Sequence, residues 1–556
     1  MQQTNKPATR IQLWLPILLS SILVVGILIG MRIQNPGPRL ALENKIAEPN
    51  GGTNAQSGKI EQLLRYIEAK YVDEVDRDLL VDQAIKNILD QLDPHSSYIP
   101  VEELNAVTEQ LEGNFDGIGV EFLILDDTVV VVTALSGGPA EQVGILAGDK
   151  IVQVEDSIVA GNGITNRGII SLLKGKKGET VKVGIIRAKD SKIKTFDIIR
   201  DRIPIKSIDV SYMLDDKTGF IKINRFAATT DREFLEALDQ LTKAGMEDLV
   251  LDLRNNPGGY LQKATNMLNQ LFTDKGELMV YTEGRSVNRA DYKTTGSTVF
   301  KLGKVAALID ESSASAAEIM AGTIQDHDRG VIVGRRSFGK GLVQEQYRLQ
   351  DGSALRLTVA RYYTPSGRSI QKSYEDLDAY KNDFKDRFES GELLSSNNIK
   401  IQDSTRYYTQ NGRIVYSGGG IIPDIFVPLD TQKMSDRHYQ LRREIPNYVF
   451  TYLEENQETL NKLNLESFTD KFKVSKNELT NFVAFAQERN PDITEATLDP
   501  QIAKDLAKQL KARIGKQLFE EQGYYRVLFE NDEMIQAALE ALKSADPITQ
   551  RTPFKD

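Results

Sequence analysis

The sequence predicts a multidomain α+β protein: an N-terminal transmembrane anchor, a helical segment, a small β-domain, an α/β domain and a helical C-terminal region. Three observations predict this order. A single uncharged apolar segment of membrane length lies near the N-terminus. From residue 113 the hydrophobic period shortens to two, and from about residue 203 strand patterns alternate with helical ones. At 556 residues the chain is long enough for several separate cores.

The composition excludes several classes of protein. The formal net charge is −10, and no basic stripe with interleaved aromatic residues is present, so we expect no nucleic-acid partner. The absence of cysteine excludes disulfides, thiolate metal sites and cysteine nucleophiles. The chain has only three histidines, which argues against a histidine-rich metal site. We therefore expect no metal and no other cofactor.

Residues 14–31 read WLPILLSSILVVGILIGM and contain no charge. With two apolar residues just before it, this segment is long enough to span a bilayer. Lys6 and Arg10 precede it, which predicts that residues 1–10 are cytoplasmic. The alternative is a cleaved signal peptide, but the apolar stretch is long for one and no clear cleavage site follows. We expect an uncleaved single-pass anchor over 11–31 in the cytoplasmic membrane, with the remaining chain in the periplasm or outside the cell.

The remaining segments are separated by composition and period. Proline, glycine and asparagine mark a linker, and apolar residues at helical spacing mark the helical parts. The predicted ranges are a linker at 32–58, a helical segment at 59–112, a β-domain at 113–202, an α/β domain at 203–430 with a polar insertion at 375–417, and a helical region at 431–556. The apolar stripe in the last region favours helix packing within the chain. A homo-oligomer or adaptor contact through the helical regions is the second interpretation.

Ser315 lies where a strand turns into a helix. Residues 305–309 form an apolar run of strand length, and apolar residues at helical spacing occupy 316–324. Such a turn exposes the serine oxygen and directs free backbone N–H groups at whatever it attacks. Lys340 follows the next predicted strand, at 331–333. If these two strands are neighbours, Ser315 and Lys340 reach the same edge of one sheet.

A serine nucleophile requires a base. His327 is expected at the far end of the same helix, and His95 and His438 lie in other segments, so a Ser-His-Asp triad is not favoured. Lysine can serve when it is neutral. Lys340 has apolar or small neighbours, and burial disfavours an ammonium. Gln344 could hold the amine through a side-chain hydrogen bond without fixing its charge.

Two competing motifs are weaker. Residues 334–340 match the first seven positions of a phosphate-binding loop, but Gly341 stands where the magnesium-binding Ser or Thr should be. A strand pattern follows it, whereas that loop must open a helix. Ser-x-x-Lys matches at 191–194 and 369–372 would suit a penicillin-recognising hydrolase. So short a pattern recurs by chance, and no Lys-Thr-Gly partner motif is present.

The β-domain resembles a PDZ domain. The resemblance rests on the loop Gly117-Ile118-Gly119-Val120 and on the run PAEQVGILAGDKI that begins at Pro139. It implies that backbone N–H groups of Gly117, Ile118, Gly119 and Val120 bind the carboxylate of a peptide C-terminus. The strand that follows would offer an open edge to the extended peptide.

The wider chain resembles the C-terminal processing peptidases, also called tail-specific proteases. The motifs that carry the resemblance, in chain order, are 93–96 (DPHS), 251–259 (LDLRNNPGG), 313–319 (SASAAEI), 337–344 (SFGKGLVQ) and 363–368 (YTPSGR). They cover roughly residues 59–430 in the order of that family. Ser313 departs from the glycine that the family often has two places before the nucleophile, although the residue remains small.

The resemblance implies a Ser-Lys mechanism without a metal. The implied roles are Ser315 as nucleophile, Lys340 as general base, Gln344 as the residue that orients the lysine, and an oxyanion hole from the N–H of Ala316 with that of Gly258 or Gly259. The chain is thus expected to be a membrane-anchored serine endopeptidase that binds free protein C-termini through its PDZ domain. The alternative is a PDZ-bearing scaffold or adaptor with an inactive protease fold.

Overall fold

The computed structural model describes residues 58–187, 192–431, 435–493 and 498–544. The predicted cytoplasmic N-terminus (1–10), the anchor (11–31) and nearly all of the linker lie outside the described residues. In the described part, no helix combines the length and apolar character needed to cross a membrane. The chain forms two compact units that divide between Val81 and Asp82.

The first unit contains helix α2 (Gly58–Lys70) and the start of α3 (Arg77–Asp90). Large apolar side chains on α2 stay in contact with solvent: Leu63 is 58% exposed and Tyr66 is 60% exposed.

The second unit begins with α4 (Val101–Glu112) and the β-domain. A ribbon of β2 (Asn114–Gly117) and β9 (Asp201–Pro204) closes this domain at its two ends. Its sheet has the strand order β3-β4-β5-β7-β8, with β6 paired to β5. The bounds are β3 Val120–Leu125, β4 Thr128–Ala134, α5 Pro139–Gln142, β5 Lys150–Val154, β6 Ser157–Ile158, α6 Asn166–Leu173, β7 Thr180–Ile186 and β8 Lys194–Ile199. Strand β3 is an edge strand, as the sequence predicts.

A six-stranded sheet forms the α/β domain, in the order β10-β11-β12-β15-β16-β21. All pairs from β11 onward are parallel. The bounds are β10 Ile208–Met213, β11 Thr218–Ile223, α7 Thr230–Lys243, β12 Asp248–Asp252, α8 Leu261–Leu268, β15 Val305–Ile309, α9 Ala316–Asp326, β16 Val331–Gly334 and β21 Ile425–Phe426. The predicted neighbourhood of the strands at 305–309 and 331–333 is confirmed.

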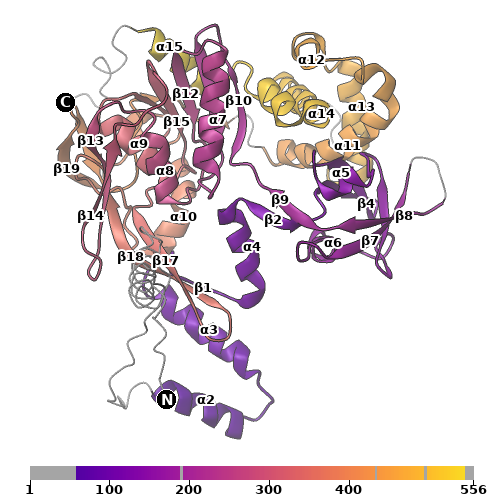
Figure 1. Ribbon diagram of the computed structural model, residues 1–556, viewed down its shortest axis with the longest axis horizontal. Helices are drawn as coiled ribbons and strands as arrows, with labels where there is room; N and C mark the ends of the chain where they lie inside the picture. Colours follow the sequence, from indigo (N-terminus) through magenta and orange to yellow (C-terminus); the bar gives the residue numbers. More distant parts are fainter. Residues whose placement is uncertain (1–57, 188–191, 432–434, 494–497, 545–556) are drawn as a thin grey trace, which may run out of the picture. The chain divides into compact units, whose positions relative to one another are not determined.

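Both faces of this sheet are covered, which explains why its strands are apolar throughout. Val305, Ala307 and Ile309 face the core shared with α7, α8 and α9. Ala306 and Leu308 face a second core that contains the C-terminal helix α15 (Glu533–Lys543). Figure 1 shows α15 beside β12 and β15.

A second, antiparallel sheet has the order β1-β18-β13-β14, with β17 also paired to β18. It joins a strand from the helical segment to strands that lie before and after α9 in the chain. The bounds are β1 Ser97–Ile99, β13 Lys275–Glu283, β14 Ala290–Thr295, β17 Leu342–Arg348 and β18 Ala354–Tyr363. The polar insertion supplies α10 (Leu377–Glu389), a short 3-10 helix (Ser396–Asn398) and the ribbon of β19 (Asp403–Tyr408) with β20 (Ile414–Ser417).

The C-terminal helical region contributes to two cores. One core is formed by four helices among themselves. They are α11 (Asp436–Leu460), α12 (Leu465–Lys471), α13 (Lys476–Arg489) and most of α14 (Pro500–Leu528). Helix α14 is kinked at Phe519 and Glu520. Beyond the kink, Tyr525 and Phe529 pack with α15 against the α/β sheet. The sequence predicts one helical region at 431–556, and the structure divides its packing between two places.

Candidate active site

Ser315 is the N-cap residue of α9 and follows the turn that ends β15. Its backbone has φ 55° and ψ −115°, a strained conformation for a residue with a side chain. Ala316 is the first helical residue, so its N–H has no partner inside the helix. The strand, the strained turn and the helix therefore present a half-buried hydroxyl next to a free N–H donor.

Lys340 lies in the loop between β16 and β17. Because β15 and β16 are parallel neighbours, Lys340 and Ser315 both follow the carboxyl edge of the sheet. Burial, and then the positive charge of Arg356, lower the pKa of Lys340. Its Nζ donates to Gln344 Oε1 at 3.2 Å. Within the described residues no hydrogen bond joins Ser315 Oγ to Lys340 Nζ, and such contacts often tighten only around substrate.

Glu318 connects the two loops that carry Ser315 and Lys340. It is fully buried, and one carboxylate oxygen accepts the N–H of Ser315 and the N–H of Lys340, both at 2.8 Å. The other oxygen accepts from Ser337 Oγ at 2.5 Å and from Gly339 N at 2.7 Å. Burial raises the pKa of Glu318 to about 7, and these four donors oppose the rise.

Tyr362 holds the same two residues from their carbonyl side. Its hydroxyl lies 3.0 Å from the carbonyl oxygen of Ser315 and 2.5 Å from that of Lys340, and donates between them. The ring is buried, and burial raises the pKa of this phenol well above its ordinary value, so it remains a donor. Glu318 and Tyr362 together fix the backbone N–H and C=O groups of both Ser315 and Lys340.

The glycine loop after β12 passes directly beside Ser315. Gly258 has φ +95°, and a Cβ placed there would lie 2.7 Å from Ser315 Cβ and 2.9 Å from Ala316 N. Its N–H donates to Asn256 Oδ1 at 2.8 Å. Gly259 has φ +143°, and a Cβ there would lie 2.2 Å from the carbonyl oxygen of Phe226. The Gly258 N–H is thus occupied inside its own loop, which favours Gly259 as the partner of Ala316 in an oxyanion hole.

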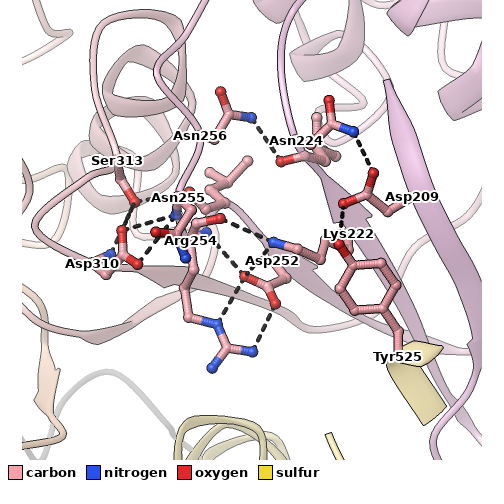
Figure 2. A network of polar contacts seen from close by, with 12 residues as sticks. Asp209, Lys222, Asn224, Asp252, Arg254, Asn255, Asn256, Asp310, Ser313 and Tyr525 are labelled. Carbon is pink, nitrogen blue, oxygen red and sulfur yellow. Dashed lines mark hydrogen bonds and ion pairs between the residues drawn. The ribbon is translucent and has the colours of Figure 1, made fainter. Parts of the chain in front are cut away.

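Figure 2 shows the polar network around Arg254, Asn255 and Asn256, the residues that lead into this loop. The Asp252 carboxylate accepts two hydrogen bonds from the Arg254 guanidinium, at 3.0 and 2.7 Å, and Lys222 Nζ donates to the Arg254 carbonyl. Asp310 accepts from the N–H of Asn255 at 3.0 Å and from Ser313 Oγ at 3.2 Å. The network ties the glycine loop to the turn that carries the nucleophile.

The PDZ loop residues lie where β2 passes into β3. Gly117 ends β2, Val120 begins β3, and Ile118 is buried between them. Gly119 has φ +73° and its carbonyl accepts from Leu135 N. The peptide-binding role of this loop stays a prediction.

The residues of the weaker candidate motifs make structural contacts. His327 caps the end of α9 and its Nε2 contacts the carbonyl of Leu278, and His438 Nε2 lies 3.0 Å from Asp505 in the C-terminal region. Lys372 is buried in an ion pair with Asp383. Of the 191–194 match, Ser191 lies outside the described residues. A strand, not a helix, follows Gly341, so the phosphate-loop match fails. Across the described ranges, no cluster of three or more His, Asp or Glu side chains could hold a metal.

Sequence reasoning missed three residues of this site: Glu318, Tyr362 and His95. The carbonyl of His95 accepts a hydrogen bond from Gln344 Nε2 at 2.5 Å, although His95 precedes Gln344 by 249 positions. A glutamate in the first turn of a helix is common for reasons of helix stability, so Glu318 carried no functional signal of its own. The one signal that existed was the place of Glu318 and His95 inside motifs of the resemblance.

Comparison with known proteins gives three family matches. Residues 217–378 match peptidase family S41, residues 117–199 match the PDZ domain, and residues 439–520 match a family of unknown function, DUF8443. The first two correspond to the α/β domain and the β-domain. The third corresponds to most of the helices that share the separate C-terminal core.

Two similar proteins come from Bacillus subtilis (strain 168). The carboxy-terminal processing protease CtpA is 35% identical over 322 residues, which is 56% of this chain and 66% of CtpA. The carboxy-terminal processing protease CtpB is 32% identical over 368 residues, which is 66% of this chain and 75% of CtpB. A solved structure, the photosystem II D1 C-terminal processing protease, is 27% identical with a TM-score of 0.33, and the match covers 67% of this chain and 89% of that one.

Glu318→Gln is expected to lower kcat about a hundredfold or more with little change in KM. The NH₂ group of the glutamine would replace a carboxylate oxygen that accepts two hydrogen bonds, so at least two hydrogen bonds are lost. The loops that carry Ser315 and Lys340 would then separate. Activity should be measured beside Glu345→Gln, which removes an exposed carboxylate on β17. Equal effects of the two substitutions would contradict the role given to Glu318.

The same variant tests the buried charge. The pKa of Glu318 is raised from an ordinary value of 4.5 to about 7. The folded chain is therefore most stable, with respect to this group, below about pH 4.5, and its free energy of unfolding falls as pH rises through about 7. Between about pH 4 and about pH 8, unfolding by urea should show that the wild-type chain loses up to about 3 kcal/mol more than Glu318→Gln. If the free energies of unfolding of wild type and Glu318→Gln change with pH in parallel, the pKa of Glu318 is not raised.

Gly258→Ala is expected to lower activity at least a hundredfold, because the added methyl group would press on Ser315 and Ala316 N. Gly276→Ala is the matched control: Gly276 has φ +93°, and a Cβ there meets nothing within 4 Å. Both substitutions should lower the melting temperature through backbone strain, and Gly258→Ala should lower it further because its methyl group also meets backbone atoms of Ala314 and Ala316. Activity is therefore compared at a temperature at which both variants are folded. An active Gly258→Ala enzyme would exclude this loop from the catalytic site.

Proposed function

Because the chain belongs to the carboxy-terminal processing proteases, serine peptidases of family S41, we propose that it cleaves proteins through a Ser-Lys mechanism, with Ser315 as the nucleophile and Lys340 as the general base. The observation that carries this proposal is the joint attachment of Ser315 and Lys340 to Glu318 and Tyr362. Two loops are held together there by their backbone groups, which leaves the hydroxyl and the amine free to react.

The proposed reaction has two halves. Neutral Lys340 takes the proton of Ser315 Oγ as that oxygen attacks the peptide carbonyl, and the N–H groups of Ala316 and of the glycine loop stabilise the oxyanion. The resulting ammonium returns its proton to the leaving amine. A water molecule then hydrolyses the acyl-enzyme with Lys340 again acting as base. Burial of Lys340 supports this cycle because it lowers the pKa of the amine and so favours its neutral form.

Substrate selection is assigned to the PDZ domain. Strand β3 has an open edge next to the Gly117–Val120 loop, so a peptide could add to β3 as a further strand and place its terminal carboxylate at that loop. The proposed substrates are therefore proteins with a free C-terminus. The PDZ-bearing scaffold without activity is not favoured, because Ser315, Lys340 and Gln344 are all present.

Location and partners rest on the N-terminal residues. We place the chain in the cytoplasmic membrane through residues 11–31, with the protease in the periplasm or outside the cell, on the strength of the apolar sequence and the preceding positive charges. The solvated apolar side chains of α2 support a contact with a second copy or an adaptor.

The mechanism is tested with the full-length chain in detergent and an unfolded protein that ends in apolar residues. Wild type should cleave this substrate and spare the same protein with an amidated C-terminus, because amidation removes the carboxylate that the PDZ loop would bind. Ser315→Ala should abolish cleavage. Cleavage that survives this substitution would exclude Ser315 as the nucleophile, and equal cleavage of both substrates would exclude tail recognition.

The anchor is tested by extraction at alkaline pH. The full-length chain should remain with the membrane pellet, whereas Val24→Arg with Ile27→Arg should release it, since each arginine near the bilayer centre costs roughly 2.5–3.5 kcal/mol. Val24→Leu with Ile27→Leu is the control and should stay in the pellet. A mature protein that begins after residue 31 would show instead that the segment is a cleaved signal peptide.

A further inference from the structure

A loop of the helical segment reaches the catalytic lysine through Gln344. The Gln344 side chain contacts two groups at once: its Nε2 donates to the carbonyl oxygen of His95 at 2.5 Å, and its Oε1 accepts from Lys340 Nζ at 3.2 Å. His95 belongs to the loop at residues 93–96 and precedes Gln344 by 249 positions in the sequence. Its backbone carbonyl, and not its ring, makes the contact to Gln344.

The His95 carbonyl decides which way the Gln344 amide faces. A carbonyl oxygen can only accept, so the amide must direct its NH₂ group to His95 and its oxygen to Lys340. In that orientation Lys340 donates one N–H and keeps its lone pair for Ser315. The opposite orientation would point the NH₂ group at the lysine, where it would donate to the lone pair and block the base.

The loop that carries this carbonyl is fixed at one side by Asp93. The carboxylate of Asp93 accepts from the N–H groups of His95 and Ser96, from Ser96 Oγ, and from Thr358 Oγ1 at 3.1 Å on β18. Thr358 lies opposite Gln344 in the β17–β18 pair. Asp93 therefore holds the loop against the strand next to the one that carries Gln344.

Tyr380 fixes the other side of the loop. Its hydroxyl lies 2.6 Å from His95 Nε2, and the His95 ring packs edge-on against the rings of Tyr380 and Phe338. Tyr380 belongs to α10 of the polar insertion, and it is held there by the ammonium of Lys372, which lies 4.2 Å from its ring centre. Through Tyr380, a segment outside the shared motifs touches the lysine site.

We propose that the Asp93–Ser96 loop and Tyr380 are positioning elements of the catalytic base, which fix the orientation of the Gln344 amide so that Lys340 keeps its lone pair free for Ser315. This inference rests on the Ser-Lys mechanism. Neither Asp93 nor Tyr380 takes part in the chemistry itself.

The test uses two substitutions that remove no charge, Tyr380→Phe and Thr358→Val. The charged groups that act on Lys340 are Arg356, Glu318 and Asp93, and the titratable ring of His95 also interacts with it; both substitutions leave all four side chains in place. Each should lower kcat about fivefold to tenfold, the effect of one lost hydrogen bond, with KM within about twofold of wild type. Tyr347→Phe is the matched control: it removes a hydroxyl contact to Glu345 on the strand of Gln344, and should keep wild-type kcat.

Two readouts separate positioning from a general loss of structure. A double-mutant cycle with Gln344→Ala should be non-additive, because Tyr380 can do nothing further once the amide is gone. Loss of the Gln344 acceptor also removes a group that favours the ammonium, so the acid limb of the kcat/KM profile should move to lower pH in Tyr380→Phe. Additive effects, or a lower plateau with an unmoved acid limb, would overturn the proposal.

A measurement without turnover distinguishes failure of this proposal from failure of the proposed function. Competitive acetylation by acetic anhydride, read by mass spectrometry of the peptide that contains Lys340, gives the protonation state of that amine at each pH. The experiment is made in the Ser315→Ala chain with and without Tyr380→Phe. A titration of Lys340 that moves to lower pH supports the positioning role even if the chain cleaves nothing, and an unchanged titration overturns it even if the chain is an active protease.

Discussion

The active site depends on one buried carboxylate, that of Glu318. Burying an ionised group costs several kcal/mol unless it is fully hydrogen-bonded, and among the described residues no cation forms an ion pair with Glu318. All four of its donors come from the turn of Ser315 and the loop at 337–340. If these segments move apart, the carboxylate loses its partners. The same bonds stabilise the strained backbone of Ser315, a conformation that costs of order 1–3 kcal/mol by itself.

A second set of contacts fixes the glycine loop from the opposite side of the sheet. Arg254 pairs with Asp252, and also with Asp532, the residue that caps α15. Lys304 donates to the last carbonyls of the same helix. Helix α15 covers one face of the central strands and holds the arginine at the base of the glycine loop. Helix α15 is therefore structurally part of the α/β domain, although it lies beyond the residues that match family S41.

The positions of Ser315 and Lys340 could be predicted from the sequence because they depend on local patterns of apolar residues. The apolar runs at 305–309 and 331–333, with a helical pattern between them, were sufficient to place Ser315 and Lys340 at one sheet edge. Glu318 and Tyr362 could not be found in this way, because their roles depend on partners up to 22 and 47 positions away along the chain, respectively. The division of the C-terminal helices between two cores was equally hidden, since both parts have the same apolar periodicity.

The contacts of Lys340 suit a buried amine whose pKa is lowered. Its side chain contacts an amide oxygen, whose partial charge orients the amine without holding a proton on it as a carboxylate would. The nearby carboxylate of Glu318 does raise the pKa of Lys340, but its oxygens are already occupied by backbone N–H groups and a serine hydroxyl. Burial remains the largest influence, and the net shift is downward. Glu318 thus binds the main chain of Lys340 and Gln344 binds its amine, and a carboxylate in place of the Gln344 amide would favour the ammonium form of the lysine.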